Sequence, residues 1–325
     1  MTSENEARVS AFSRRDVEIA FRLVRGTKPD EADIDHLMNH AGSLDQLRKV
    51  LIKEAGPRLH KQFKEIGPNP KLMRAGSQRV DVDVPAAVLE RLLAHVESVW
   101  RGFGDSDPFW SVLTKFKPAG AETDKETFYA TGQRRVELFT AALARNAIDV
   151  KSLPVCLEIG SGVGRLTLWL ADHFQRVIAA DISGSHLKIA EDELRARGKT
   201  NVSFVNVSTM AALADIAPFD AFFSMISLQH SPPPVIKHVL MTVLGKLKPG
   251  GVGYFQLPTL IPDQVFDAEA YLADPDAHKG METFAVPQPI LFDMFEQLGL
   301  KVLEFREDNQ VGPQKLSNTI LVRKP

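Results

Sequence analysis

The first part of the chain has apolar residues at helical spacing, interrupted by polar turns. This pattern predicts three short amphipathic helices, over residues 13–25, 30–42 and 43–56. Each begins at a capping residue, Ser13, Asp30 or Ser43, and stops at a glycine, Gly26, Gly42 or Gly56. Three such helices can share one small core, so we expect an all-helical module over residues 1–66.

A segment dense in glycine, proline and polar residues, IGPNPKLMRAGSQ, follows this module and predicts a linker over residues 67–78. Helical spacing then returns at 88–100 and 127–147, with an irregular stretch between the two. We expect residues 79–150 to form a helical segment that covers the domain after it.

From Val155 onward the pattern alternates between short apolar runs and amphipathic segments. The predicted strands include VCLEI, VIAADI, VSFVNV, FDAFFSMIS and VGYFQL, and two more, KVLEFRE and NTILVRK, close the chain. Helices are predicted through Leu170 and over about 185–197, 234–247 and 288–298. Such alternation is typical of an α/β domain, with a mainly parallel sheet and helices on both faces, which we place at 151–325.

Composition and charge exclude several classes of protein. The 325 residues are 44% hydrophobic and 25% charged, which suits a globular chain, and the formal net charge of -2 gives no bulk reason to expect nucleic acid as a partner. A single cysteine excludes an internal disulfide and a cysteine-rich zinc site, and we expect no metal. No apolar run reaches the about 18 residues of a membrane span or resembles a signal peptide, so we expect a cytoplasmic protein.

The stretch CLEIGSGVGRL, residues 156–166, places glycines directly after the first predicted strand of the α/β region. In a parallel sheet, ligands bind at the carboxyl ends of the strands. The dinucleotide pattern needs glycine or alanine where Arg165 stands, and a phosphate loop needs Gly-Lys-Ser/Thr after its last glycine. Both patterns fail here, and Glu158 would repel a pyrophosphate.

Glu158, the three glycines and Asp181 at the end of the second strand together resemble the first two motifs of the class I S-adenosylmethionine-dependent methyltransferases. The resemblance covers about 127–325 and implies a Rossmann-like, mainly parallel seven-stranded sheet with S-adenosylmethionine as cofactor. Asp181 would accept the ribose hydroxyls, and Tyr129 would lie over the methionine end. The residues that the resemblance assigns to the cofactor are Tyr129, Glu158, Gly160, Ser161, Gly162, Gly164, Asp181, Ile182, Ser208, Thr209, Met225 and Ile226. Where the family usually has an acid near the adenine, this chain has Ser208 and Thr209.

Methyl transfer to a hydroxyl requires loss of a proton, and His230 after the fourth strand is the candidate base. The alternative is that His230 only caps its loop or contacts the cofactor. We expect the acceptor pocket to use three groups of residues: Tyr254, Phe255 and Gln256 at the end of the fifth strand; Phe109 and Trp110; and the insert 259–287. The insert is long enough for a lid or a substrate loop, or it is a surface elaboration.

Two further resemblances favour one acceptor class. The amino-terminal helices resemble a small module fused to bacterial glycan-modifying enzymes, and LQHSPPPVIKHVL and GGVGYFQLPT resemble bacterial methyltransferases associated with polysaccharide synthesis. We therefore expect O-methylation of a sugar or glycan. The alternatives are O- or N-methylation of a small aromatic or lipid-like metabolite, or a non-catalytic scaffold that binds an adenosyl ligand. The amino-terminal helices would serve a protein partner or self-association.

Overall fold

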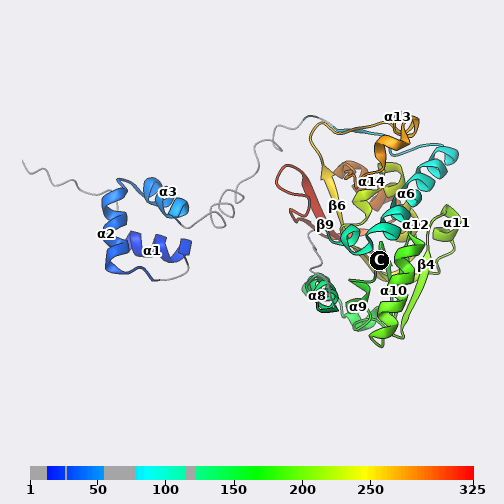
Figure 1. Cartoon of the computed structure of the whole chain (residues 1–325), viewed down its shortest axis with the longest axis horizontal. Coiled ribbons are helices and arrows are strands. Elements are labelled where there is room, and N and C mark those ends of the chain that lie inside the picture. Colours follow the sequence, from blue (N-terminus) through cyan, green and yellow to red (C-terminus); the bar gives the residue numbers. More distant parts are fainter. Residues whose placement is uncertain (1–12, 26–27, 55–75, 77, 115–121) are drawn as a thin grey trace, which may run out of the picture. The chain divides into compact units, whose positions relative to one another are not determined.

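The computed structural model describes residues 13–25, 28–54, 76, 78–114 and 122–325 (Figure 1). The chain divides into two compact units, Met1–Met73 and Arg74–Pro325. Gly26, Gly56 and nearly all of the predicted linker lie outside the described residues.

The first unit contains the three predicted helices, α1 (Arg14–Arg25), α2 (Glu31–His40) and α3 (Leu44–Glu54). Their amino ends are capped as the sequence predicts: Asp30 accepts a hydrogen bond from the Asp33 amide at 2.8 Å, and the amide of Ser13 donates to Asp16 at 2.7 Å. The three helices share one small apolar core, made of Val17, Phe21, Ile34, Leu37, Ala41, Leu47 and Leu51.

The second unit is built on a seven-stranded sheet with the order β4-β3-β2-β5-β6-β9-β8. The strands are β2 (Val155–Ile159), β3 (Arg176–Asp181), β4 (Val202–Asn206), β5 (Phe219–Ser224), β6 (Leu247–Leu260), β8 (Lys301–Glu307) and β9 (Leu316–Arg323). Neighbours from β4 to β6 are parallel, and β9 pairs antiparallel with both β6 and β8. The expected Rossmann-like, mainly parallel sheet is confirmed.

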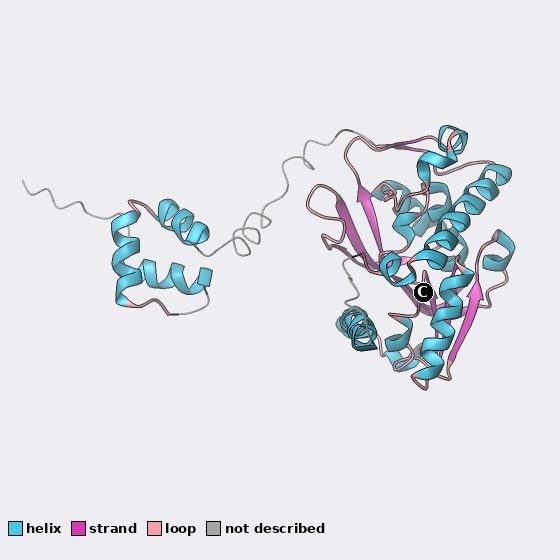
Figure 2. Ribbon diagram, in the orientation of Figure 1, coloured by secondary structure: helices cyan, strands magenta, loops and turns pink. Residues whose placement is uncertain are grey.

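Helices cover both faces of this sheet (Figure 2). The main ones are α6 (Ala86–Ser106), α8 (Glu122–Arg145), α9 (Thr167–Leu170), α10 (Gly184–Ala196), α12 (Pro233–Gly245) and α14 (Gln288–Gln297). Alternate strand residues enter different cores because successive side chains point to opposite faces. Leu157 and Ile159 of β2 pack in the core that includes α6, α12 and α14, whereas Cys156 packs in the core that includes α8.

The structure corrects one expectation about local structure and adds elements that the sequence pattern did not predict. The predicted irregular stretch after Trp100 is helical in its described part, because α6 continues to Ser106 and Asp107 caps a further helix, α7 (Pro108–Val112). The insert carries a short strand β7 (Val265–Phe266) that pairs with β1 (Arg79–Val80), then α13 (Ala268–Ala273) and a 3₁₀ turn, Pro275–His278. A short helix, α11 (Met210–Ala214), follows β4. Among the described helices, none combines the length and the apolar character that a membrane crossing needs.

Candidate active site

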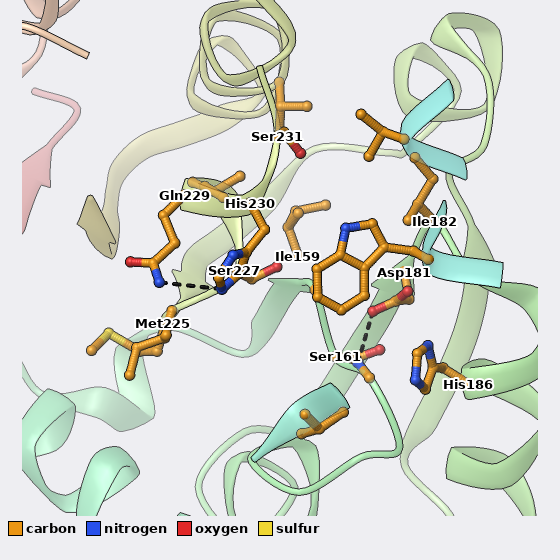
Figure 3. Close-up of a pocket in the computed structure, with 18 of the residues that line it drawn as sticks. Ile159, Ser161, Asp181, Ile182, His186, Met225, Ser227, Gln229, His230 and Ser231 are labelled. Carbon is orange, nitrogen blue, oxygen red and sulfur yellow. Dashed lines mark hydrogen bonds between the residues drawn. The ribbon is translucent and has the colours of Figure 1, made fainter. Parts of the chain in front are cut away.

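A cavity of about 500 Å³ opens at the carboxyl ends of β2, β3 and β5. Figure 3 shows that Asp181 and His230 approach it from opposite sides. The lining includes eight of the residues predicted for the cofactor: Gly160, Ser161, Gly162, Asp181, Ile182, Thr209, Met225 and Ile226. The strand, loop and helix order predicted this place because parallel strands end at one edge of the sheet.

The glycine loop forms the floor of the cavity and has no room for side chains at its first two glycines. Gly160 has a φ of +78°, and a Cβ there would lie 1.7 Å from Ser227 Oγ. A Cβ on Gly162 would lie 2.6 Å from Val112 Cγ2 in α7. The buried hydroxyl of Ser161, which also lines the cavity, has no hydrogen-bond partner among the described residues. The loop thus offers close backbone approach and an unpaired hydroxyl to a ligand.

Asp181 lies at the end of β3 and holds the glycine loop in place. Its carboxylate accepts hydrogen bonds from the amides of Gly162 and Ser183, both at 2.8 Å. A carboxylate has about four acceptor positions, so these two bonds do not use up its capacity to accept from a ligand. Burial raises the pKa of Asp181, while nearby His186 and the backbone amides act in the opposite direction.

His186, on α10, also lines the cavity, and the sequence analysis did not select it. The Ser111 hydroxyl donates to the Pro108 carbonyl at 3.0 Å and lies 2.9 Å from His186 Nε2. Because the hydroxyl has a single proton, His186 Nε2–H donates to Ser111, which leaves the lone pair on Nδ1. That buried Nδ1 has no partner within the described part of the chain, and burial lowers the pKa of His186. Burial thus favours the neutral imidazole, in which Nδ1 is an acceptor beside Asp181.

His230 ends a 3₁₀ turn, Leu228–His230, after β5, and its tautomer follows from its neighbours. Nδ1 lies 2.6 Å from the carbonyl oxygen of Glu282 in the insert, and a carbonyl can only accept, so Nδ1 carries the proton. Nε2, 3.2 Å from the Gln229 amide nitrogen, is left with its lone pair. Burial lowers the pKa of His230, so the ring is neutral at neutral pH.

The Gln229 amide is oriented by a chain of hydrogen bonds that starts at the backbone. The Ile226 amide N–H can only donate, and it donates to Gln256 Oε1 at 3.1 Å. The Gln256 Nε2 therefore donates to Gln229 Oε1, also at 3.1 Å, and to Ser317 Oγ at 2.6 Å. Gln229 is left with only its amino group to present to His230. The Ile226 amide at one end of the chain and the Glu282 carbonyl at the other thus require the same state of His230. In that state the ring is neutral and Nε2 carries the lone pair.

Four residues predicted for the cofactor do not line the cavity. Tyr129 is buried behind the loop, where its hydroxyl donates to the Val163 carbonyl at 2.8 Å. Glu158 accepts from the Thr167 hydroxyl at 2.6 Å, and burial raises its pKa to about 7. Gly164 packs against α10, since a Cβ there would lie 2.4 Å from Leu194 Cδ1. Ser208 lies between two lining residues without lining the cavity itself.

The expected acceptor pocket also differs. Tyr254 and Phe255 point into the two cores rather than into the cavity, and Phe109 and Trp110 are not among its lining residues. Within the insert, Met281 does line it. Four lining residues that the sequence pattern did not predict come from distant elements: Trp100 on α6, Arg135 on α8, Arg165 after the glycine loop and Gln310 in the β8–β9 connection.

Part of the cavity lining lies in a segment that is similar to known proteins. Residues 156–251 match a family model described as a methyltransferase domain, which covers less than a third of the chain. The chain is 27% identical over 158 residues to protein-L-isoaspartate O-methyltransferase 1 of Polaromonas sp. (strain JS666 / ATCC BAA-500), a match that covers 49% of this chain and 61% of that protein. Protein-L-isoaspartate O-methyltransferase 2 of Syntrophobacter fumaroxidans is 28% identical over 120 residues, covering 37% of this chain and 45% of that protein. The chain thus spans less than two thirds of the length of these two relatives.

Among solved structures, the magnesium protoporphyrin IX methyltransferase of Synechocystis PCC 6803, crystallised with bound SAH, superposes with a TM-score of 0.50 and 14% sequence identity. That superposition covers 70% of this chain and 99% of the other. The likeness is one of fold, and the glycine loop, Asp181 and the turn that bears His230 all lie inside the segment that matches the family model. Residues 156–251 therefore match a methyltransferase domain model, and they lie within a Rossmann-like fold.

Proposed function

We propose that this chain is an S-adenosylmethionine-dependent methyltransferase that transfers a methyl group to a hydroxyl of a sugar or glycan. The observation that carries the proposal is the cavity at the carboxyl ends of β2, β3 and β5. It brings the glycine loop, Asp181 and a neutral His230 together within one methyltransferase domain.

The residues at the cavity fit the cofactor. Asp181 keeps acceptor capacity for the ribose hydroxyls after binding the amides of Gly162 and Ser183. The absent Cβ atoms of the loop allow an adenosyl ligand to approach the backbone, and the unpaired Ser161 hydroxyl can bond to its polar groups. A volume of about 500 Å³ lies within the range of cofactor sites. When bound, the cofactor supplies an electrophilic methyl group on a sulfonium.

His230 is the base of the proposed reaction. Its Nε2 lone pair takes the proton that the acceptor hydroxyl loses as its oxygen forms the new bond to carbon, while Nδ1–H remains bonded to the Glu282 carbonyl. The Gln229 contact at 3.2 Å lies at the upper end of the hydrogen-bond range, so the acceptor hydroxyl can replace it. A neutral ring at neutral pH is the state that such a base needs.

Different observations support the two parts of the proposed acceptor, namely that the methyl group goes to a hydroxyl and that the acceptor is a glycan. A base at the cavity favours oxygen over an amine that arrives already neutral, and both curated relatives are named as O-methyltransferases. The glycan is favoured by the resemblances of the amino-terminal helices and of the segments at 228–240 and 250–259. The apolar part of the lining, with Trp100, Met225 and Met281, favours the second candidate, a small aromatic or lipid-like metabolite.

Two measurements on the full chain test the proposal. Calorimetric titration with S-adenosylmethionine, S-adenosylhomocysteine and NAD should give binding of the first two alone, and binding of NAD alone would overturn it. A screen with methyl-labelled cofactor against sugars, glycans, phenols and lipids then separates the acceptor classes. Cofactor binding without transfer to any class would instead indicate a scaffold that binds an adenosyl ligand.

A further inference from the structure

The two ends of the cavity differ in charge. Asp181 ends β3, while Arg135 donates to Gln310, in the β8–β9 connection, at 2.7 Å. In the sheet, β3 and β9 lie on opposite sides of β2, so acid and guanidinium approach from opposite directions. Of the described residues that line the cavity, Asp181 is the sole carboxylate, and Arg135 and Arg165 are the two groups that stay cationic at neutral pH.

Arg165 is a buried cation that lacks an ion pair with the residues that the structure describes, which is uncommon in folded proteins. It is 8% exposed, and its Nε has no hydrogen-bond partner among the described residues. Its Nη1 donates to the Thr131 hydroxyl at 3.3 Å, and the described part of the chain gives neither Arg165 nor Arg135 an ion pair with a carboxylate. Burial and then the positive charge of Arg135 lower the pKa of Arg165 to about 10, so it remains protonated at neutral pH. A buried cation without a counter-ion is costly to keep in a folded chain, so the position of Arg165 favours binding of an anion, whereas Arg135 is only half-buried.

Glu158 does not supply that anion. It attracts Arg165, but it is buried beneath the loop and bonded to Thr167, and burial raises its pKa to about 7, which weakens its negative charge at neutral pH. The three histidines of the lining, His186, His230 and His238, all have pKa values lowered by burial and add no negative charge.

The cofactor cannot balance the cationic end either. This step takes S-adenosylmethionine as the cofactor, so the inference rests on the function proposed above. S-adenosylmethionine has a sulfonium, an ammonium and one carboxylate, so it adds net positive charge. Its carboxylate can pair with one guanidinium, and Arg165 adjoins the glycine loop, which leaves Arg135 without an anion. An acceptor without charge would leave that excess in place.

We propose that the acceptor carries an anionic oxygen group, a carboxylate or a phosphate, which Arg135 binds at the end of the cavity formed by α8 and the β8–β9 connection. The planar guanidinium suits both groups because it donates two parallel hydrogen bonds. For a glycan acceptor, this means an acidic or phosphorylated sugar. Gln310 orients the guanidinium through its bond to Nη2 and leaves the remaining N–H groups for the ligand.

The test uses the full chain saturated with S-adenosylhomocysteine, titrated with inorganic phosphate, glucuronate and uncharged glucose. We expect phosphate and glucuronate to bind and glucose to bind at least tenfold more weakly. Arg135→Gln should weaken both anions about 10- to 100-fold, the range for a hydrogen bond to a charged group, and should keep the affinity for S-adenosylhomocysteine. Arg134→Gln is the matched control, since Arg134 is exposed and does not line the cavity.

Sinefungin, which has an amine in place of the methylated sulfur, provides a second readout. Its extra positive charge should tighten the binding of glucuronate compared with the S-adenosylhomocysteine complex. The proposal is overturned if glucose binds as well as glucuronate, if Arg135→Gln binds both anions unchanged, or if no anion binds the saturated chain. Failure of the wild-type chain to bind S-adenosylhomocysteine would overturn the proposed function itself, which is a different result. Thermal unfolding of both variants confirms that they are folded.

Discussion

The hydrogen bond between Gln229 and His230 provides a direct test of the assigned tautomer. Gln229→Glu keeps the shape of the side chain and replaces the amino group that faces His230 Nε2 with a carboxylate oxygen. The other oxygen can still accept from Gln256 Nε2, as Gln229 Oε1 does. A negative charge at Nε2 stabilises the imidazolium, so the pKa of His230 should rise from its lowered value.

The separation of the two groups sets the size of the effect. At the 3.2 Å that separates Gln229 Nε2 from His230 Nε2, two unit charges attract by about 1.3 kcal/mol at the dielectric constant of water and by about 5 kcal/mol at an effective value of 20. One pKa unit corresponds to about 1.4 kcal/mol, so the pKa should rise by about 1 to 4 units. Because only neutral His230 can take a proton, the acidic limb of the rate profile should move to higher pH by the same amount.

Long-range proton–nitrogen NMR of histidine-labelled chain measures this pKa without an identified acceptor. The chain has nine histidines, and the signal missing from His230→Gln identifies the right one. At high pH the wild-type spectrum should show the Nδ1–H form. Gln297→Glu, an exposed site outside the cavity, should leave the pKa of His230 unchanged. An unshifted pKa in Gln229→Glu, or the Nε2–H form in the wild type, would refute the assigned network.

Two other substitutions test the cofactor side, by titration calorimetry and by thermal unfolding. Asp181→Asn should lower the affinity for S-adenosylmethionine by about 100-fold, because each bond from a ribose hydroxyl to a carboxylate contributes about 1.5 to 3 kcal/mol. The control Asp215→Asn should leave the affinity unchanged. Equal affinities of the two variants would show that Asp181 does not bind the cofactor. Gly160→Ala should destabilise the fold more than Gly250→Ala, since both have φ near +80° but only Gly160 has an atom, Ser227 Oγ, within 1.7 Å of the new Cβ. Equal losses would mean that backbone strain of about 1 to 2 kcal/mol is the entire effect.

The folding pattern and the part of the cavity lining formed by the glycine loop and Asp181 could be predicted because their signals are local in the sequence. The glycine loop follows directly after β2, and Asp181 ends β3, so a strand, a turn and a helix in sequence were enough to place them. Directions of side chains were not local. Whether Glu158 faces the cavity depends on Thr167 across the loop, and whether Tyr129 does depends on the Val163 carbonyl.

The other half of the cavity needed contacts between elements far apart in the chain. His230 meets the insert through the Glu282 carbonyl, 52 residues away, and Arg135 meets Gln310 across 175 residues. Arg165 served in the sequence only to exclude a dinucleotide site. It is nevertheless an arginine within a stretch of glycine and apolar residues, a pattern that indicates burial. A buried cation is stable only when it is paired with an anion. Arg165 therefore indicates a ligand with a negative group, besides excluding a dinucleotide.

The two parts of the lining, one encoded locally and one assembled from distant elements, correspond to the cofactor and the acceptor of the proposed reaction. The cofactor is the same for every enzyme of this kind, so a short contiguous loop with one acid can serve it. The acceptor differs, and in the proposed reaction its surroundings would come from α6, α8, the insert and the β8–β9 connection, each of which can change without disturbing the glycine loop. Charge provides the most specific sign of that acceptor in this chain. Trp100 and the methionines of the lining would accept many ligands, whereas a guanidinium without a counter-ion, held beside a second one, favours only those that bring a negative group.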